Sequence, residues 1–325
     1  MLLKKKIKDI FKETRYYKFI RIIYLFFTRK GFKYHFLQKR FLSFNSRNYL
    51  GKIEKLLVNL IFFKDRSFFK KYFYKENNFS KMLKIQGISE PFVLESLSRY
   101  KNEIIDYYEK NKIFDDKNPS HFFLREDRKP NLKVGYYDTK VTARCPYMFD
   151  LINDPFIVKT LSNYFKSPFK LDYVNAWWSF KNVNSEINEK TQFFHRDVDN
   201  FNFIKVFIYL TDVDLEDGPN EYIIKSHTNS YGAKINHRHF YDSDMTEEMK
   251  SNLFSFKGKS GTAIFANTYG LHRGKTPKKN DRLILVLSYS LLNTFYCPEK
   301  PFLHFNDIKT NQKKINSFLN SSYLI

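Results

Sequence analysis

Two histidines and one aspartate in the second half of the chain have the types and spacing of metal ligands. His195 and Asp197 lie two residues apart in the segment FFHRD, and in extended backbone such residues point to the same side. Both can therefore reach one metal ion. A third ligand must come from elsewhere, and His272, in the segment YGLH, precedes the last long apolar run. Two histidines and one carboxylate on one face of a metal leave other positions open, as in non-haem Fe(II) oxygenases.

An arginine follows the second histidine at a spacing that suits an anion site. Arg282 begins the segment RLILVLSYS, ten residues after His272, and is the one strong anion binder in that run. A planar guanidinium suits two-point binding of a carboxylate. An H-x-D pair alone is common by chance, but the order H-x-D, distal His, then Arg makes a four-point pattern. The pattern indicates a metal centre beside a carboxylate-binding residue.

Other polar residues compete for these roles. Asp199 faces the same way as Asp197 in extended chain and is the main rival carboxylate, but H-x-D spacing places Asp197 closer to His195. His237 and His239 form an H-x-H in a polar stretch, which is more typical of a solvated loop than of a metal site.

Short apolar runs separated by turns must position these residues. Spacing of three or four between apolar residues predicts a helix over 90–114, and Asp154-Pro155 predicts the start of another, because Asp caps and Pro suits the first helical position. After Phe165 the chain changes to strand-like runs at 171–180, 203–211, 221–224, 262–265 and 283–289. Such a series without intervening helices predicts a sandwich or barrel. Trp177 and Trp178 alternate, so one should face the barrel interior and the other its outside.

On these features the sequence resembles the phytanoyl-CoA dioxygenase family over residues 85–295. The segment GPNEYIIKSH at 218–227 is similar to the Gly-rich turn, apolar strand and Pro-Gly-Ser-His ending of that family, with Ile224-Lys225 in place of Pro-Gly. The Asp-Pro helix and the closing Arg-plus-apolar strand are also similar. The resemblance implies a mainly β fold, a double-stranded β-helix (jelly roll, cupin-like) with flanking α-helices.

The resemblance also implies the chemistry of the site. Ferrous iron would be bound by His195, Asp197 and His272, with 2-oxoglutarate bound by Arg282 and O2 as the oxidant. A basic residue upstream of the Asp-Pro helix lies toward the 2-oxoglutarate pocket in the family, which favours Lys140 here. By the same resemblance, His227 is structural and Arg144 is the second choice for the basic residue.

We therefore expect an Fe(II)- and 2-oxoglutarate-dependent dioxygenase that hydroxylates a small molecule or a carrier-linked metabolite. Because Asp197 is not replaced by a small residue, no position is vacated for a halide, and hydroxylation is favoured over halogenation. Two alternatives stay open: a catalytically silent jelly-roll binding protein, and a zinc-dependent jelly-roll enzyme using the same three ligands. Arg282 argues against the zinc enzyme, since simple hydrolysis needs no carboxylate-binding residue.

Composition indicates a folded protein of the reducing cell interior. Apolar residues make up 42% of the 325 residues and aromatic residues 19%, which excludes a disordered chain. Cys145 and Cys297 form no C-x-x-C pair, so neither a disulfide framework nor a structural zinc site is indicated. We expect three parts: an N-terminal extension at 1–85, the jelly-roll domain at 86–300 and a C-terminal tail at 301–325.

The net charge of +22 lies mostly in the extension, because residues 1–85 contain 23 Lys/Arg and 5 Asp/Glu. Its start predicts a basic amphipathic helix, and its longest uncharged apolar run, at 22–27, is too short to cross a bilayer. Two interpretations stay open: binding to an anionic membrane surface, or a helical cap on the main domain. Nucleic acid is the less favoured partner, since no nucleic-acid module is recognisable. We expect a cytoplasmic protein, with the extension as a peripheral membrane contact.

Overall fold

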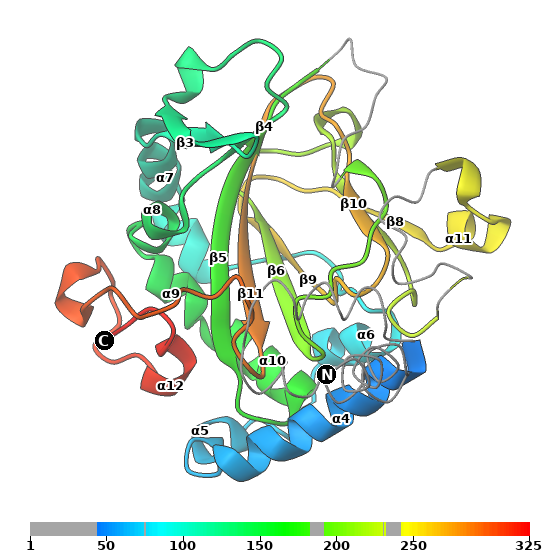
Figure 1. Ribbon diagram of the computed structural model, residues 1–325, viewed down its shortest axis with the longest axis vertical. Helices are drawn as coiled ribbons and strands as arrows, with labels where there is room; N and C mark the ends of the chain where they lie inside the picture. The colour runs from blue at the N-terminus through cyan, green and yellow to red at the C-terminus, as the bar shows by residue number, and fades with distance from the viewer. Residues whose placement is uncertain (1–43, 75, 183–191, 230, 232–241) are drawn as a thin grey trace, which may run out of the picture.

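Two antiparallel sheets face each other at the centre of the molecule (Figure 1). The computed structural model describes residues 44–325 except 75, 183–191, 230 and 232–241. The basic helix expected at the start of the chain and the histidines at 237 and 239 lie outside the described residues. Among the described residues, no helix combines the length and the apolar character needed to cross a membrane.

The major sheet has eight strands in the order β1-β9-β6-β11-β5-β4-β2-β3, and the minor sheet has three in the order β10-β7-β8. In chain order the strands are β1 (Phe92–Val93), β2 (Ile113–Asp115), β3 (Asn118–Phe123), β4 (Val134–Tyr136), β5 (Lys170–Ser179), β6 (Phe203–Tyr209), β7 (Asn220–Ile223), β8 (Leu253–Phe256), β9 (Thr262–Ala266), β10 (His272–Gly274) and β11 (Arg282–Ser290). Five of them match the predicted runs. The predicted helix over 90–114 ends earlier, because β2 begins at Ile113.

The chain passes repeatedly between the two sheets, which defines the jelly roll. It runs from β5 in the major sheet to a bridge at His195 beside β10, back to β6, across to β7 and β8, then to β9, β10 and β11. Eight extended segments thereby alternate between two facing sheets, as in a double-stranded β-helix. The predicted fold class is confirmed.

The central strands of the major sheet are buried on both faces. On the face toward the minor sheet lie Phe207 and Ile284, and on the opposite face Ile208 and Leu283. Every residue of β6 and β11 is buried, which explains why β11 reads as one continuous apolar run. The alternation also separates the two tryptophans as predicted. Trp177 packs against the buried side chains that face the minor sheet, and Trp178 belongs to the buried cluster on the opposite face.

Helices cover the outer face of the major sheet (Figure 1). Asp154 caps α10, accepting from the backbone N–H of Phe156 at 2.8 Å, with Pro155 in the first turn as predicted. The tail at 301–325 packs there too, since Tyr323 accepts a hydrogen bond from the N–H of Val174 at 3.0 Å. The helices after β1 are α7 (Glu95–Lys110), α8 (Thr139–Ala143), α9 (Met148–Ile152), α10 (Pro155–Phe165), α11 (Glu247–Ser251) and α12 (Ser317–Asn320).

Three N-terminal helices pack against the jelly roll: α4 (Phe44–Ile61), α5 (Arg66–Lys70) and α6 (Asn78–Ile85). These helices and the turn after α5 add buried side chains to the cluster on the outer face of the major sheet, namely Val58, Phe69, Phe73 and Leu83. Helix α4 also contacts the loop before β6: Arg47 donates to the carbonyl of Asn200 at 2.6 Å, and Glu54 accepts from Asn202 at 2.7 Å. Residues 44–85 thus form a helical cap. The membrane interpretation was made for residues 1–85, of which 1–43 lie outside the described residues, and it stays a prediction.

Candidate metal centre and anion pocket

Pairing between the two sequence motifs brings the histidines together. The N–H of His195 donates to the carbonyl of His272 at 3.0 Å, and the N–H of His272 donates to the carbonyl of His195 at 3.1 Å. This two-residue antiparallel bridge sets the imidazole centroids 4.3 Å apart. Ser226 stabilises the segment that leads into His272, because its Oγ accepts a hydrogen bond from the N–H of Leu271 at 2.7 Å.

Both imidazoles are oriented by the backbone. His195 Nδ1 lies 2.9 Å from the carbonyl of Phe193, and His272 Nδ1 lies 3.0 Å from that of Gly270. A carbonyl accepts only, so each Nδ1 carries a proton, and in the neutral form of each ring the lone pair is then on Nε2. Burial, followed by the neighbouring His272, lowers the pKa of His195 to about 4, so that imidazole is neutral at neutral pH. Backbone bonds of this kind are typical of histidines that bind metals.

Asp197 completes the cluster. Its Oδ1 lies 3.7 Å from His195 Nε2, and its Oδ2 lies 3.3 Å from His272 Nε2. The three ligand atoms lie within 4.8 Å of one another, and this is the one such group among the described residues. Two lone pairs directed at a carboxylate repel it unless a cation lies between them, so the donor set fits a metal ion. Asp199, the rival carboxylate, is not part of the group.

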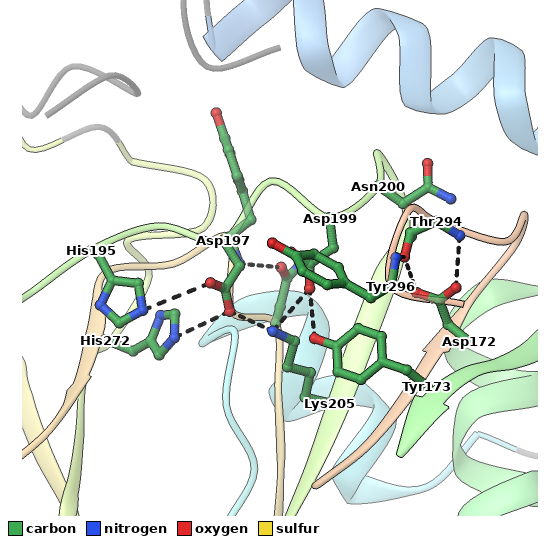
Figure 2. Close-up of polar contacts among 12 residues, drawn as sticks. Asp172, Tyr173, His195, Asp197, Asp199, Asn200, Lys205, His272, Thr294 and Tyr296 are labelled. Atoms are coloured by element: carbon green, nitrogen blue, oxygen red, sulfur yellow. Dashed lines mark hydrogen bonds and ion pairs between the residues drawn. The ribbon is translucent and has the colours of Figure 1, made fainter. Parts of the chain in front are cut away.

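Lys205 approaches Asp197 from the side opposite the histidines (Figure 2). Its Nζ lies 2.6 Å from Oδ2 of Asp197 and 2.9 Å from Oδ2 of Asp199. Burial opposes the charge on Asp197, but the ammonium of Lys205 holds the pKa of this carboxyl well below its usual range. Sequence analysis missed Lys205. The signal was a lone lysine in the otherwise apolar run FIKVFIY, since a buried lysine is rare unless it is paired.

Arg282 lies at the start of β11, opposite Ser179 at the end of β5. One of its terminal nitrogens, Nη2, donates to Ser179 Oγ at 3.0 Å. The other donors, Nε and Nη1, are buried without a hydrogen-bond partner, and Arg282 forms no ion pair with any described residue. Burial accordingly lowers the pKa of Arg282. An unpaired buried guanidinium is unfavourable, so this position is suited to an anion supplied by a ligand.

One cavity of about 190 Å³ joins the two features. The histidines, Asp197 and Arg282 all line it. Further lining comes from the inner faces of β5 and β6, namely Tyr173, Asn175, Trp177, Ser179, Lys205 and Phe207. A second cavity of about 290 Å³ adjoins it, since both are lined by Val134, Tyr136 and Gln192. The second cavity lies between the β2–β3 hairpin and the segment that leads into β4.

The structure does not bring Lys140 to this cavity. Lys140 lies in the first turn of α8, its side chain is exposed, and it is not among the residues that line the cavity. Asp138 caps α8 by accepting from the Lys140 N–H at 2.7 Å, which fixes the backbone but not the ammonium. Lys140 is thus not among the residues that line this cavity, and its contact with 2-oxoglutarate stays a prediction.

Lys225, one of the two residues at which the segment departs from the family pattern, has an unusual backbone conformation. Lys225 has φ +66°, the left-handed conformation that favours glycine, at the position where the family has Gly. Its N–H donates to the carbonyl of Gln86 at 2.8 Å. His227, predicted to be structural, lies 3.1 Å through Nε2 from the carbonyl of Lys84 and takes no part in the metal cluster.

The topology and the cluster together define a jelly-roll protein with two histidines and one carboxylate at the mouth of a buried cavity. No protein-family model matches the chain, and no curated protein matches it. Solved structures resemble it at low sequence identity, and some of them are described as non-heme and alpha ketoglutarate dependent enzymes. HygX from Streptomyces hygroscopicus, solved with nickel, 2-oxoglutarate and hygromycin B, is 15% identical, with 66% of this chain and 87% of that chain covered and a TM-score of 0.45.

The epimerase SnoN, in complex with Fe3+, alpha ketoglutarate and nogalamycin RO, is 13% identical, with 65% of this chain and 82% of that chain covered and a TM-score of 0.47. AviO1 from Streptomyces viridochromogenes is also 13% identical, with 65% and 93% covered and a TM-score of 0.41. At these TM-scores the likenesses assign no function to this chain.

Proposed function

We propose that this chain is an Fe(II)- and 2-oxoglutarate-dependent oxygenase. The observation that supports it best is that one buried cavity is lined both by the His195, Asp197 and His272 cluster and by the unpaired guanidinium of Arg282. A two-histidine, one-carboxylate face leaves coordination positions open for a cosubstrate and O2. A cofactor with a carboxylate at its far end would supply the anion that Arg282 lacks.

In this proposal each residue has a defined task. His195 and His272 would bind iron through Nε2, and Asp197 through one oxygen. Arg282, steadied by Ser179, would bind the distal carboxylate of 2-oxoglutarate and so set its orientation. With iron and 2-oxoglutarate bound, the centre would supply an oxidant made from O2 as 2-oxoglutarate is converted to succinate and CO2. The buried walls would keep water from that oxidant.

We infer that the substrate is a small or carrier-linked molecule that enters through the second cavity. Pockets for drug-sized ligands usually measure roughly 300–1,000 Å³, and the metal cavity alone is smaller than that. With 2-oxoglutarate in the metal cavity, the body of the substrate would need the adjoining space. Hydroxylation is the expected outcome, because Asp197 keeps its ligand position. The Ser-His ending and the left-handed Lys225 support a likeness to the phytanoyl-CoA dioxygenase family.

An anaerobic titration tests the proposal. Adding 2-oxoglutarate to the Fe(II)-loaded protein should produce the visible charge-transfer absorption of the chelated cofactor. His195→Ala, Asp197→Ala and His272→Ala should each abolish it, because each removes one ligand. His304→Ala, at an exposed histidine outside the cavity, is the matched control and should behave as wild type. Near-native iron affinity in all three ligand variants would contradict the metal assignment.

Aerobic turnover separates the oxygenase from the two alternatives. The oxygenase should form succinate in an Fe(II)-dependent reaction that a substrate accelerates. Hydrolysis of a substrate by the zinc-loaded protein without 2-oxoglutarate would favour the zinc enzyme. A protein that binds ligands but neither forms succinate nor hydrolyses a substrate would favour the silent binding protein.

A further inference from the structure

Lys205 is a buried cation between two carboxylates on the inner face of the jelly roll. It lies on the same face of β6 as Phe207 and Tyr209, so its side chain enters the cavity rather than the outer core. Its Nζ contacts Asp197 at 2.6 Å and Asp199 at 2.9 Å, and its side chain is only 10% exposed. One lysine therefore links a candidate ligand to a carboxylate outside the ligand group.

The contact with Lys205 restricts how Asp197 can turn. Figure 2 shows the two histidines on one side of this carboxylate and Lys205 on the other. Rotation of the carboxylate about its last bond would break the 2.6 Å contact, which is a charge-assisted hydrogen bond. Asp197 is thereby set to offer one oxygen to a metal while the other oxygen remains bonded to the lysine.

Asp199 is held away from the histidines by the same lysine. Its Oδ2 accepts from the Tyr173 hydroxyl at 2.8 Å as well as from Lys205, and its side chain is only 4% exposed. A neighbouring carboxylate, Asp172, is separately bonded by the N–H of Thr294 at 2.7 Å and its Oγ1 at 2.6 Å. Lys205 thus shares its charge between Asp197 and Asp199, and Asp199 is bonded to Lys205 and Tyr173 through the same oxygen.

We propose that Lys205 is a positioning residue for the metal centre: anchored by Asp199 and Tyr173, it orients Asp197 as a single-oxygen ligand and keeps Asp199 out of the coordination shell. The inference rests on the proposed metal-binding function and extends it to the selection between two nearby carboxylates.

Binding of Mn²⁺, measured by calorimetry and electron paramagnetic resonance, tests this role without turnover. Removing Lys205 alone changes the charge near the metal, so the informative variant is the charge-matched pair Lys205→Met with Asp199→Asn. We expect its Mn²⁺ affinity to fall about tenfold, with an altered resonance spectrum, because residues that orient ligands typically contribute about 10- to 100-fold. Lys259→Met with Asp212→Asn removes an exposed pair, at 2.9 Å, and should change nothing.

Two further variants guard against a folding defect. Lys205→Arg keeps the charge and a donor, and should recover part of the lost affinity. Asp199→Asn alone is nearly isosteric, and should weaken Mn²⁺ binding because Lys205 then pairs with Asp197 only. Wild-type affinity and spectrum in the charge-matched pair, or in folded Asp199→Asn, would overturn the role of Lys205. A wild-type protein that binds no Mn²⁺ would instead overturn the proposed metal centre itself.

Discussion

Arg282 is buried with two donor nitrogens unbonded, and this makes it the sharpest probe of the cosubstrate at the scale of single residues. We expect Arg282→Lys to raise the Kd for 2-oxoglutarate while leaving Mn²⁺ affinity unchanged. An ammonium offers a point charge where a planar fork is needed. Losing a hydrogen bond to a charged group costs about 1.5–3 kcal/mol, or about 10- to 100-fold in affinity.

Lys140→Met is the matched control for this measurement. Its ammonium is exposed outside the cavity, so the Kd for 2-oxoglutarate should not change. If Lys140→Met weakened 2-oxoglutarate binding and Arg282→Lys did not, the anion site would lie elsewhere.

Lys225 offers a stability test at a second residue. Its φ of +66° costs a residue with a side chain about 1–2 kcal/mol in the folded state. Glycine avoids this cost, but it also makes the unfolded chain more flexible, which offsets part of the gain. Lys225→Gly should therefore raise the free energy of unfolding by about 0.5–1 kcal/mol. Lys225→Ala keeps Cβ and should leave stability near wild type. Equal stabilities of both variants in urea titration would contradict the strain.

At the scale of elements, α4 is joined to the loop that leads from the metal ligands into β6. Arg47 bonds the backbone of Asn200, and Asn202 donates from Nδ2 both to the carbonyl of Gly51 at 2.8 Å and to Glu54 at 2.7 Å. Glu54 has no exposed surface, and burial raises its pKa to about 8 despite the hydrogen bonds from Asn202. The helix therefore contributes a pH-dependent contact next to the site.

The sign of that dependence follows from the raised pKa. The folded protein binds the Glu54 proton more tightly than the unfolded chain does, so this stabilisation is complete below about pH 4.5 and is lost as the pH rises to about 8. Glu54→Gln stays neutral and should flatten this part of the curve of the free energy of unfolding against pH, by on the order of a few kcal/mol. Glu103→Gln, at an exposed carboxyl, should leave the curve unchanged. A wild-type slope in Glu54→Gln would rule out this assignment.

At the scale of the whole molecule, truncation separates the described cap from the residues before it. Residues 1–43 carry 13 Lys/Arg and 2 Asp/Glu, and each basic residue near an anionic surface contributes about 1 kcal/mol before screening. A chain of residues 44–325 should fold and bind Mn²⁺ but lose salt-sensitive binding to phosphatidylserine vesicles. A full-length protein that ignores such vesicles at low salt would contradict the membrane interpretation.

A longer truncation, to residues 62–325, should behave differently. It removes the contacts of Arg47 and Glu54 with the loop before β6, and it also removes the buried Val58. We expect an insoluble product or a soluble one with weakened Mn²⁺ binding. Wild-type solubility and Mn²⁺ affinity would show that α4 does not support the site.

The sequence by itself determined the features that depend on near neighbours. The Asp154 cap, the continuous apolar run of β11 and the same-side placement of His195 and Asp197 all follow from local backbone geometry. The order of the motifs along the chain then indicated that His272 and Arg282 belong to the same site as His195 and Asp197. The short strands β8 and β10 were not predicted, because runs of four and three residues carry too little periodicity.

Only the tertiary structure decided which charges meet. It placed Lys205 between two carboxylates, left Lys140 exposed and set Glu54 of α4 against Asn202. Sequence spacing fixes the face of a strand or helix on which a side chain lies, but it does not fix what lies opposite that face. The energies of buried charges depend on that opposing surface, because a charge removed from water needs a partner within a few ångströms, and these partners come from distant parts of the chain.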